Sequence, residues 1–375
     1  MSKVEKKRLV ILGSTGSIGR HALNIVDRFP DQLEVVALSC NSRSKLFEEQ
    51  LEKYQPLAYA VASEDENGLE RLASISGVDL VVVGVVGTAG IAPTVAALKK
   101  GTNVALATKE VMVIAGEAIM ELAAEVGAKI IPIDSEHSAM FQSLLSGNVK
   151  ELNKVYLTMG YGKIAQMKKQ DIDLLTKEEV LKTNKWVMGQ KITVDSASCV
   201  NKIFEAIEAA HLFSLNAEQI QIVVHPEYLC HSLVEFVDGS IIGEFGTANM
   251  DRYLQYALFY PKRMPAPKTD FISLLDQTLT FKTPDYERFP ILNLISKIIN
   301  SPHNLAAVFH GADRAVVEAF LADQIKFGDI EKIIAQALDD YQPSKTTTDD
   351  KIKQALEIES VGYELAQQII EKNYV

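Results

Sequence analysis

Cysteine and tryptophan are scarce in this chain of 375 residues, which contains three cysteines and one tryptophan. Cys40, Cys199 and Cys230 are odd in number and far apart, so they fit neither a disulfide framework nor a thiolate metal cluster. A reducing, cytoplasmic setting is therefore expected. Long apolar runs are missing as well. The first one ends at Gly13, far short of a signal peptide or a membrane span, and we expect no targeting segment.

Positive charge is in deficit, with 38 Lys and Arg against 49 Asp and Glu and a formal net charge of -11. Nucleic acids and anionic membranes are bound mainly through clustered Lys and Arg, so this balance argues against both as partners. A small anionic ligand is still compatible, because a few local cations and backbone amides hold a phosphate in an acidic protein. We expect a small-molecule partner, no nucleic acid and no membrane.

Short apolar strands alternate with helical stretches in the first 150 residues, as a parallel α/β sheet requires. Residues 9–12 predict a buried strand followed by a glycine turn and a helix. Residues 81–83 are three consecutive valines and predict a strand buried on both faces. The fold class is therefore α/β, with an N-terminal doubly wound, Rossmann-like domain. Its other strands are expected at 33–38, 102–107 and 128–133.

The remainder of the chain predicts further domains, because 375 residues exceed what one simple core holds. Four short strands indicate a mixed α+β region, a proline-rich stretch indicates a connecting arm, and helical periodicity follows. The expected divisions are 1–150 for the nucleotide domain, 151–260 for a central catalytic, metal and dimerisation domain, 261–288 for the arm, and 289–375 for a small helical domain.

A glycine-rich turn separates the first strand from the first helix. Glycines there permit a tight turn and a close backbone approach, so that amides at the helix N-terminus hold a pyrophosphate. The turn predicts a dinucleotide site, with a purely structural turn as the alternative. The candidate cofactor-binding residues in it are Gly13, Thr15, Gly16, Ser17 and Ile18.

The segment after the second strand indicates which dinucleotide is bound. A site that prefers NAD carries Asp or Glu there for the ribose hydroxyls, but this chain has Asn41, Ser42 and Arg43. The arginine, with the neighbouring serine, predicts NADPH. The alternative is a solvated cationic loop with no ligand.

Two carboxylates, Asp134 and Glu136, leave the end of an apolar segment two residues apart. In an extended backbone, residues i and i+2 point to the same side. Oxygen ligands presented together suit a hard divalent cation such as Mg²⁺ or Mn²⁺, provided that a third carboxylate arrives from elsewhere. The alternative is a solvated strand end.

A helix expected to begin near Cys199 supplies a candidate for that third ligand. The preceding hydroxyl-rich segment 193–198 is expected to cap this helix. On the helix, Glu205 shares a face with Asn201 and Glu208, and Asn201 and Lys202 place an amide and an ammonium where a phosphate or hydroxyl fits. Glu205 is the candidate metal ligand, whereas simple solvation is enough to explain Glu208.

Ordered motifs along nearly the whole chain resemble the 1-deoxy-D-xylulose 5-phosphate reductoisomerase family. They comprise the glycine turn, Val86-Gly87-Thr88-Ala89-Gly90, Leu106-Ala107-Thr108-Lys109-Glu110, Asp134-Ser135-Glu136-His137, Trp186-Val187-Met188-Gly189-Gln190-Lys191-Ile192, Val194-Asp195-Ser196-Ala197 with Asn201-Lys202, His225-Pro226 and His231-Ser232.

The resemblance implies an NADPH- and metal-dependent enzyme of isoprenoid biosynthesis. Such an enzyme converts 1-deoxy-D-xylulose 5-phosphate to 2-C-methyl-D-erythritol 4-phosphate by a skeletal rearrangement and a hydride reduction. A homodimer is implied as well. By position, the resemblance assigns metal binding to Asp134, Glu136 and Glu205 and a catalytic role to Lys109. It adds Thr108, Glu110 and Gly189 to the cofactor contacts. The residues that it assigns to the substrate are Lys109, Ser135, Glu136, Trp186, Met188, Ser196, Asn201, Lys202, Glu205 and His231.

Departures from the family pattern lie on the phosphate and flap side of the expected pocket. Gly160 stands where a serine is usual, Thr183 where a histidine is usual, and Tyr228 where a small serine is usual, while Thr108 replaces an asparagine. Two alternatives therefore stay open. One is a paralogue that performs the same chemistry on another ketose phosphate, such as ribulose or xylulose 5-phosphate, and the other is a non-catalytic NADPH-binding sensor.

The proposed metal role of Glu205 gives a first prediction. Glu205→Gln removes the negative charge but keeps the size of the side chain, so metal-dependent turnover should be abolished while the Kd for NADPH stays nearly the same. Steady-state rates with Mg²⁺ or Mn²⁺ and a direct NADPH titration measure the two effects. Unchanged activity in this variant contradicts the metal role.

Overall fold

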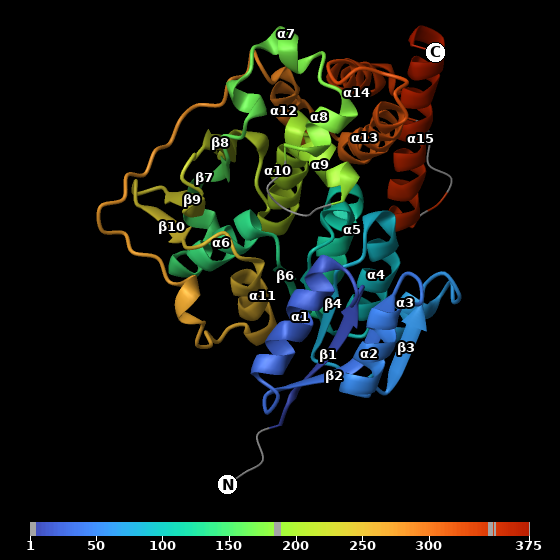
Figure 1. Ribbon diagram of the computed structural model, residues 1–375, viewed down its shortest axis with the longest axis vertical. Helices are drawn as coiled ribbons and strands as arrows, with labels where there is room; N and C mark the ends of the chain where they lie inside the picture. The colour runs from blue at the N-terminus through green and yellow to red at the C-terminus, as the bar shows by residue number, and fades with distance from the viewer. Residues whose placement is uncertain (1–4, 184–188, 344–347, 349, 375) are drawn as a thin grey trace. The chain divides into compact units, whose positions relative to one another are not determined.

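The computed structural model describes residues 5–183, 189–343, 348 and 350–374 (Figure 1). These residues form two compact units. The first comprises residues up to Val111 together with Glu117–Leu145 and Glu244–Gln277, and the second comprises Met112–Gly116, Ser146–Gly243 and the residues from Thr278 onward. The division into four functional domains stays a prediction. Trp186 and Met188 lie outside the described residues.

The first unit is built on a six-stranded sheet whose neighbouring strands run parallel. The strand order β3-β2-β1-β4-β5-β6 is that of a doubly wound dinucleotide-binding fold, in which ligands bind at the carboxyl ends of the strands near the point where the order reverses. The predicted α/β class is confirmed. The strands are β1 (Lys7–Leu12), β2 (Leu33–Cys40), β3 (Ala58–Val61), β4 (Leu80–Val83), β5 (Asn103–Leu106) and β6 (Ile130–Pro132).

The central strands are apolar on both faces because helices cover the sheet on both sides, as a parallel sheet requires. Leu9, Ile11 and Val82 are fully buried. Helices of the first unit are α1 (Ser17–Arg28), α2 (Lys45–Tyr54), α3 (Gly68–Ala73), α4 (Ile91–Lys99), α5 (Lys109–Val126), α6 (Ser135–Ser143) and α11 (Met250–Phe259).

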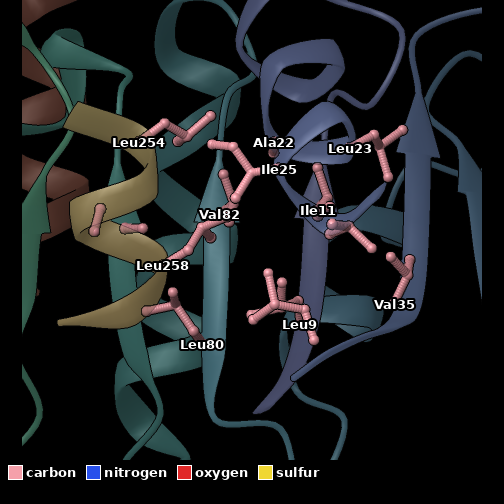
Figure 2. Packing of buried hydrophobic residues seen from close by; sticks show 14 of the residues in the cluster. Leu9, Ile11, Ala22, Leu23, Ile25, Val35, Leu80, Val82, Leu254 and Leu258 are labelled. Carbon is pink, nitrogen blue, oxygen red and sulfur yellow. The ribbon is translucent and has the colours of Figure 1, made fainter. Parts of the chain in front are cut away.

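Helix α11 comes from a distant part of the sequence and completes the core of the first unit. Leu254 and Leu258 join the cluster formed by residues of β1, β4 and α1, and Figure 2 shows them facing Val82 and Leu80. The helix also contacts α1 through polar groups, with Nδ1 of His21 2.6 Å from a carboxylate oxygen of Asp251. The apolar periodicity of the first 150 residues alone therefore does not account for this core.

The second unit contains a four-stranded sheet in the order β10-β9-β7-β8. β7 runs parallel to β8 and antiparallel to β9, so the carboxyl ends of β7 and β8 meet at one edge of the sheet. A turn at Asp238 and Gly239 joins β9 to β10, and the amide of Phe236 donates to the carbonyl of Ser240 across it at 2.9 Å. The strands are β7 (Leu152–Met159), β8 (Ile220–Val224), β9 (Cys230–Phe236) and β10 (Ile241–Phe245).

Helices dominate the rest of the second unit. The long α13 and α15 lie side by side (Figure 1). Gly311 and Gly362 permit this close approach, because a side chain at either position would overlap the backbone of the facing helix. The predicted C-terminal helices are confirmed. The helices of this unit are α7 (Lys169–Ile172), α8 (Lys177–Leu181), α9 (Gln190–Ser198), α10 (Val200–Phe213), α12 (Leu294–Ile299), α13 (Leu305–Leu321), α14 (Asp329–Asp340) and α15 (Lys351–Asn373).

No helix among the described residues has both the length and the low charge content that are needed to cross a bilayer.

The contribution of α11 to the core gives a second prediction. Leu258→Ala should lower the free energy of unfolding by roughly 2–5 kcal/mol, because it leaves a cavity in a fully buried cluster. Leu275→Ala, at a leucine that is 80% exposed in the same unit, is the matched control and should change it by less than about 0.5 kcal/mol. Urea denaturation measures both variants. Equal effects of the two substitutions would contradict a core role for α11.

Candidate active site

The glycine turn lies between β1 and α1 at the carboxyl end of the sheet. Gly13 has a φ of 83°, and a side chain there would press on the carbonyl of Gly84. Gly16 is the N-cap residue of α1, and no side chain caps this helix. The first backbone N-H groups of α1, at Ser17 and Ile18, are therefore suited to bind a pyrophosphate.

Polar groups from two other elements brace this turn. The amide of Gly13 donates to Oγ of Ser39 at 3.0 Å. The fully buried Ser14 donates from its hydroxyl to Oε1 of Gln50 at 2.7 Å, and Nε2 of Gln50 donates back to the carbonyl of Ser14 at 3.0 Å. Both Ser39 and Gln50 were missed in the sequence, because nothing local links a glutamine in α2 to a turn 36 residues earlier.

The predicted NADPH-selecting residues follow β2. Arg43 is paired with Glu64 and with Glu48, each at 3.0 Å, and its guanidinium lies over the ring of Tyr59 at 5.7 Å from the centroid. The planar guanidinium is thus held in place by carboxylates and a ring on three other segments. Because two carboxylates already pair with the guanidinium, the binding of the 2′-phosphate of NADPH by Arg43 stays a prediction. Asn41 and Ser42 are exposed beside it.

Asp134 and Glu136 lie at the start of α6 and not in an extended segment. Asp134 is the N-cap residue and accepts from the amide of Ser135 at 2.9 Å, and Glu136 lies in the first turn, where it accepts from the Ser135 hydroxyl. The prediction that an extended backbone aligns them was wrong, because an Asp-Ser-Glu sequence after a strand is a strong helix start. The helix N-terminus still stabilises both negative charges.

Lys109 joins this group from the neighbouring strand. It begins α5 directly after β5, and its Nζ lies 2.8 Å from Oδ2 of Asp134. Both side chains are mostly buried, at 13% and 19% exposure. Thr108 fixes the loop before Lys109, since its hydroxyl donates to the carbonyl of Val85 at 2.5 Å. Glu110 follows in the first turn of α5.

His137 is a further residue of this cluster that had no role in the sequence prediction. Its ring is fully buried, and Nδ1 lies 3.7 Å from Oδ2 of Asp134. The distance is too long for a hydrogen bond, so the contact places His137 beside Asp134 but assigns it no role. The sequence could have indicated this residue, because His137 directly follows Glu136 in the run that includes both carboxylates.

The segment 193–198 is helical, so its predicted role as a cap was wrong. It belongs to α9, and Cys199 breaks the helix with a φ of 68° before α10 begins. The apolar Val194 and Ala197 are buried and hold α9 against the unit, whereas Ser196 is exposed. Gly189 is the N-cap residue of α9 and, like Ser196, lies in the second unit.

The predicted polar face of α10 is buried and bonded internally. Glu205 is 2% exposed, pairs with Lys202 and accepts from the Asn201 amide. Nζ of Lys202 also donates to the carbonyl of Thr158 on β7 at 2.6 Å. Glu208 is 1% exposed, so the expectation that it is simply solvated was wrong.

Two other predicted positions lie in the second unit. His231 is on β9 and is buried. Thr183, where a flap histidine was expected, donates its hydroxyl to the carbonyl of Val180 at 2.6 Å and so closes the last turn of α8. Its hydroxyl therefore has a local structural partner.

Each unit presents acidic side chains that are balanced by a lysine. Asp134 has Lys109 in the first unit, and Glu205 has Lys202 in the second. Carboxylate oxygens are the donor type that hard divalent cations prefer. The carboxylates of Asp134 in the first unit and of Glu205 in the second are therefore both suitable ligands for the predicted Mg²⁺ or Mn²⁺.

Family models match three parts of the chain. The model described as 1-deoxy-D-xylulose 5-phosphate reductoisomerase matches residues 9–67 and 64–116. The model described as the C-terminal domain of 1-deoxy-D-xylulose 5-phosphate reductoisomerase matches residues 130–213, and the one described as the DXP reductoisomerase C-terminal domain matches 245–363.

Individual relatives agree over their full lengths. The 1-deoxy-D-xylulose 5-phosphate reductoisomerase of Thermodesulfovibrio yellowstonii is 37% identical, covering 97% of this chain and 99% of the relative. The one of Pelotomaculum thermopropionicum is 40% identical, covering 90% and 92%. Among solved structures, a reductoisomerase complex with magnesium has a TM-score of 0.90 at 30% identity, covering 98% of this chain and 99% of that one. The Zymomonas mobilis enzyme with NADPH has a TM-score of 0.86 at 32% identity, covering 98% and 100%.

The position of Arg43 gives a third prediction. Arg43→Ala should raise the KM for NADPH about tenfold, because charge-assisted hydrogen bonds to the 2′-phosphate are lost, and should leave the KM for NADH within about twofold. Lys45→Ala removes a neighbouring cation whose side chain is 93% exposed, and this control should change neither constant. Initial rates over a range of each cofactor measure the effect. An equal loss with NADPH and NADH contradicts the assignment.

Proposed function

This chain belongs to the 1-deoxy-D-xylulose 5-phosphate reductoisomerase family, and on that premise we propose that it converts 1-deoxy-D-xylulose 5-phosphate to 2-C-methyl-D-erythritol 4-phosphate with NADPH and a divalent cation. The observation that carries the proposal is the pairing of one acidic residue with one lysine in each unit, Asp134 with Lys109 and Glu205 with Lys202. A protein that only bound NADPH would need the first unit but not these buried charges, whose burial costs stability.

We propose that Asp134, Glu136 and Glu205 together hold the divalent cation. Support comes from the family assignment and from the donor set, which consists of carboxylates at the start of α6 and on α10. A bound cation supplies Lewis-acid polarisation of the substrate ketone, and bound NADPH supplies the hydride. The remaining steps depend on side chains of this chain.

Lys109 is the proposed electrostatic and proton-transfer group. Its ammonium lies beside Asp134 in a mostly buried place, where a positive charge acts strongly on a nearby oxyanion. In the proposed reaction it stabilises negative charge on the substrate oxygen during the rearrangement and exchanges a proton with it.

The cofactor and substrate contacts complete the proposal. The turn amides and Arg43 orient NADPH, with further contacts from Thr108, Glu110 and Gly189. Ser135 binds the substrate near the metal. The other substrate contacts are assigned to Ser196, Asn201, Lys202 and His231, and to Trp186 and Met188 as a flap that excludes water.

We further propose that the enzyme acts as a homodimer in the cytoplasm, as a step of isoprenoid biosynthesis. Cys40, Cys199 and Cys230 are free and buried, which is compatible with a reducing compartment. Burial raises the pKa of the Cys199 thiol to about 12, so this thiol stays protonated and unreactive at neutral pH.

The fourth prediction tests the activity directly. NADPH oxidation should be seen with 1-deoxy-D-xylulose 5-phosphate, should stop when the divalent cation is chelated, and should return when Mg²⁺ or Mn²⁺ is added. Parallel assays contain ribulose 5-phosphate or xylulose 5-phosphate. Turnover of either of these without turnover of the deoxy sugar overturns the substrate assignment, and no turnover of any of them indicates a binding protein.

A further inference from the structure

Two loops of the second unit meet where the parallel strands β7 and β8 end. Gly160 follows β7, and the segment from His225 to Tyr228 follows β8. The amide of His225 donates to the carbonyl of Met159 at 2.8 Å and joins the two loops. The carboxyl edge of parallel strands is where ligands bind in α/β sheets, so this is a place at which a substrate contact is expected.

The loop that carries Tyr228 is rigid. The ring of His225 is 1% exposed, lies between the carbonyl of Thr280 at 2.9 Å and the amide of Leu229 at 3.2 Å, and stacks on Phe281 at 4.8 Å. Such a histidine acts as an internal brace. Tyr228 is therefore presented from a fixed support and not from a free loop end.

Tyr228 adopts a conformation that its size disfavours. Its φ is 55°, in the left-handed region that bulky L-residues rarely occupy, and its side chain remains about half exposed. Core packing does not explain an exposed aromatic residue held with backbone strain. Strain of this kind is typical of residues that contact a ligand.

The phenol of Tyr228 also dictates which residue stands at position 160. A Cβ on Gly160 would overlap Oη, Cζ and Cε1 of Tyr228, so a side chain there would force the phenol out of its present position. The tyrosine hydroxyl thus lies beside the backbone position where the family pattern has a serine. Compared with the family pattern, this chain has no hydroxyl on residue 160, but the hydroxyl of Tyr228 lies close to that position.

The surroundings keep this hydroxyl in its protonated, donating form. Burial raises the pKa of Tyr228, while the backbone of Tyr161 and the charge of Lys202 act in the opposite direction without overcoming it. A protonated phenol donates one hydrogen bond. The ammonium of Lys202 is anchored to Thr158, two residues before Gly160 on β7, and supplies positive charge to the same end of the sheet.

We propose that the Tyr228 hydroxyl binds the phosphate group of the substrate together with Lys202, replacing the serine hydroxyl that Gly160 lacks. The inference rests on the proposed function, because it requires a phosphorylated substrate. The ring makes this contact longer and stiffer than a serine contact, so Tyr228 also determines how far the phosphate lies from the end of β7. It is a specificity-determining residue.

Tyr228→Phe is the fifth prediction and removes only the hydroxyl. The KM for 1-deoxy-D-xylulose 5-phosphate and the inhibition constant of inorganic phosphate should both rise about tenfold or more, because a hydrogen bond to a charged group is lost. The kcat and the KM for NADPH should stay within about twofold. The slow turnover of 1-deoxy-D-xylulose, which has no phosphate, should be unaffected. Tyr286→Phe, at a partly exposed tyrosine of the same unit, is the control and should change none of these constants.

A reciprocal exchange tests the coupling between the two positions. Gly160→Ser alone should weaken phosphate binding, since its Cβ displaces the phenol, whereas the double variant Gly160→Ser with Tyr228→Ser should recover phosphate affinity to within about threefold of the wild type. Additive losses in the double variant contradict the coupling. Unchanged constants in Tyr228→Phe, or an equal loss with the phosphorylated and unphosphorylated sugars, overturn the proposal.

Failure of the proposed function is distinguished by a measurement that needs no turnover. Direct calorimetric titration with inorganic phosphate should show about tenfold weaker binding to Tyr228→Phe than to the wild type, whether or not the deoxy sugar is the substrate. Equal phosphate binding by the two proteins overturns the role of Tyr228 even if the wild type turns over the deoxy sugar.

Discussion

A carboxylate that is removed from water needs a positive partner, and the acidic groups of this protein follow that constraint. Lys109 lies against Asp134, and Lys202 against Glu205. Lys191 repeats the arrangement, with Asp195 at 2.7 Å and Asp313 at 2.5 Å. Burial alone would lower the pKa of Lys191, but the two carboxylates outweigh it and raise that pKa. Removing one member of such a pair leaves the other charge uncompensated.

The same constraint links stability to chemistry. The lysines that pair with the acidic groups, Lys109 and Lys202, are also groups that the proposed reaction uses, so their charges are in place before substrate binds. No large reorganisation of dipoles is then required when substrate arrives, which is the condition under which electrostatic stabilisation is effective. The start of α6 supports Asp134 and Glu136 with its partial positive charge.

Much of the fold was predictable because its signals are local. Apolar runs located every strand of the first sheet except the edge strand β3, which was missed, and the glycine turn located the carboxyl end where ligands bind. The nature of the site followed from the side chains of Asp134, Glu136 and Glu205. Their backbone setting did not, since Asp-Ser-Glu was interpreted as extended but begins α6, and the hydroxyl-rich segment before Cys199 was interpreted as a cap but forms α9.

Contacts between distant parts of the sequence could not be predicted. Helix α11 enters the core of a unit whose strands end more than a hundred residues earlier, and no pattern inside 250–259 specifies that partner. The bond from Gln50 to Ser14 and the burial of Glu208 belong to the same class. Each depends on which surfaces the folded chain brings together, and a single sequence does not encode this in a local pattern.

The overlap between a side chain at 160 and the ring of Tyr228 makes the two positions interdependent. A serine at 160 requires the phenol to leave its present place, and the phenol in its present place requires glycine at 160. A change at either position alone therefore alters what the other residue can contact, so we expect the two positions to change together.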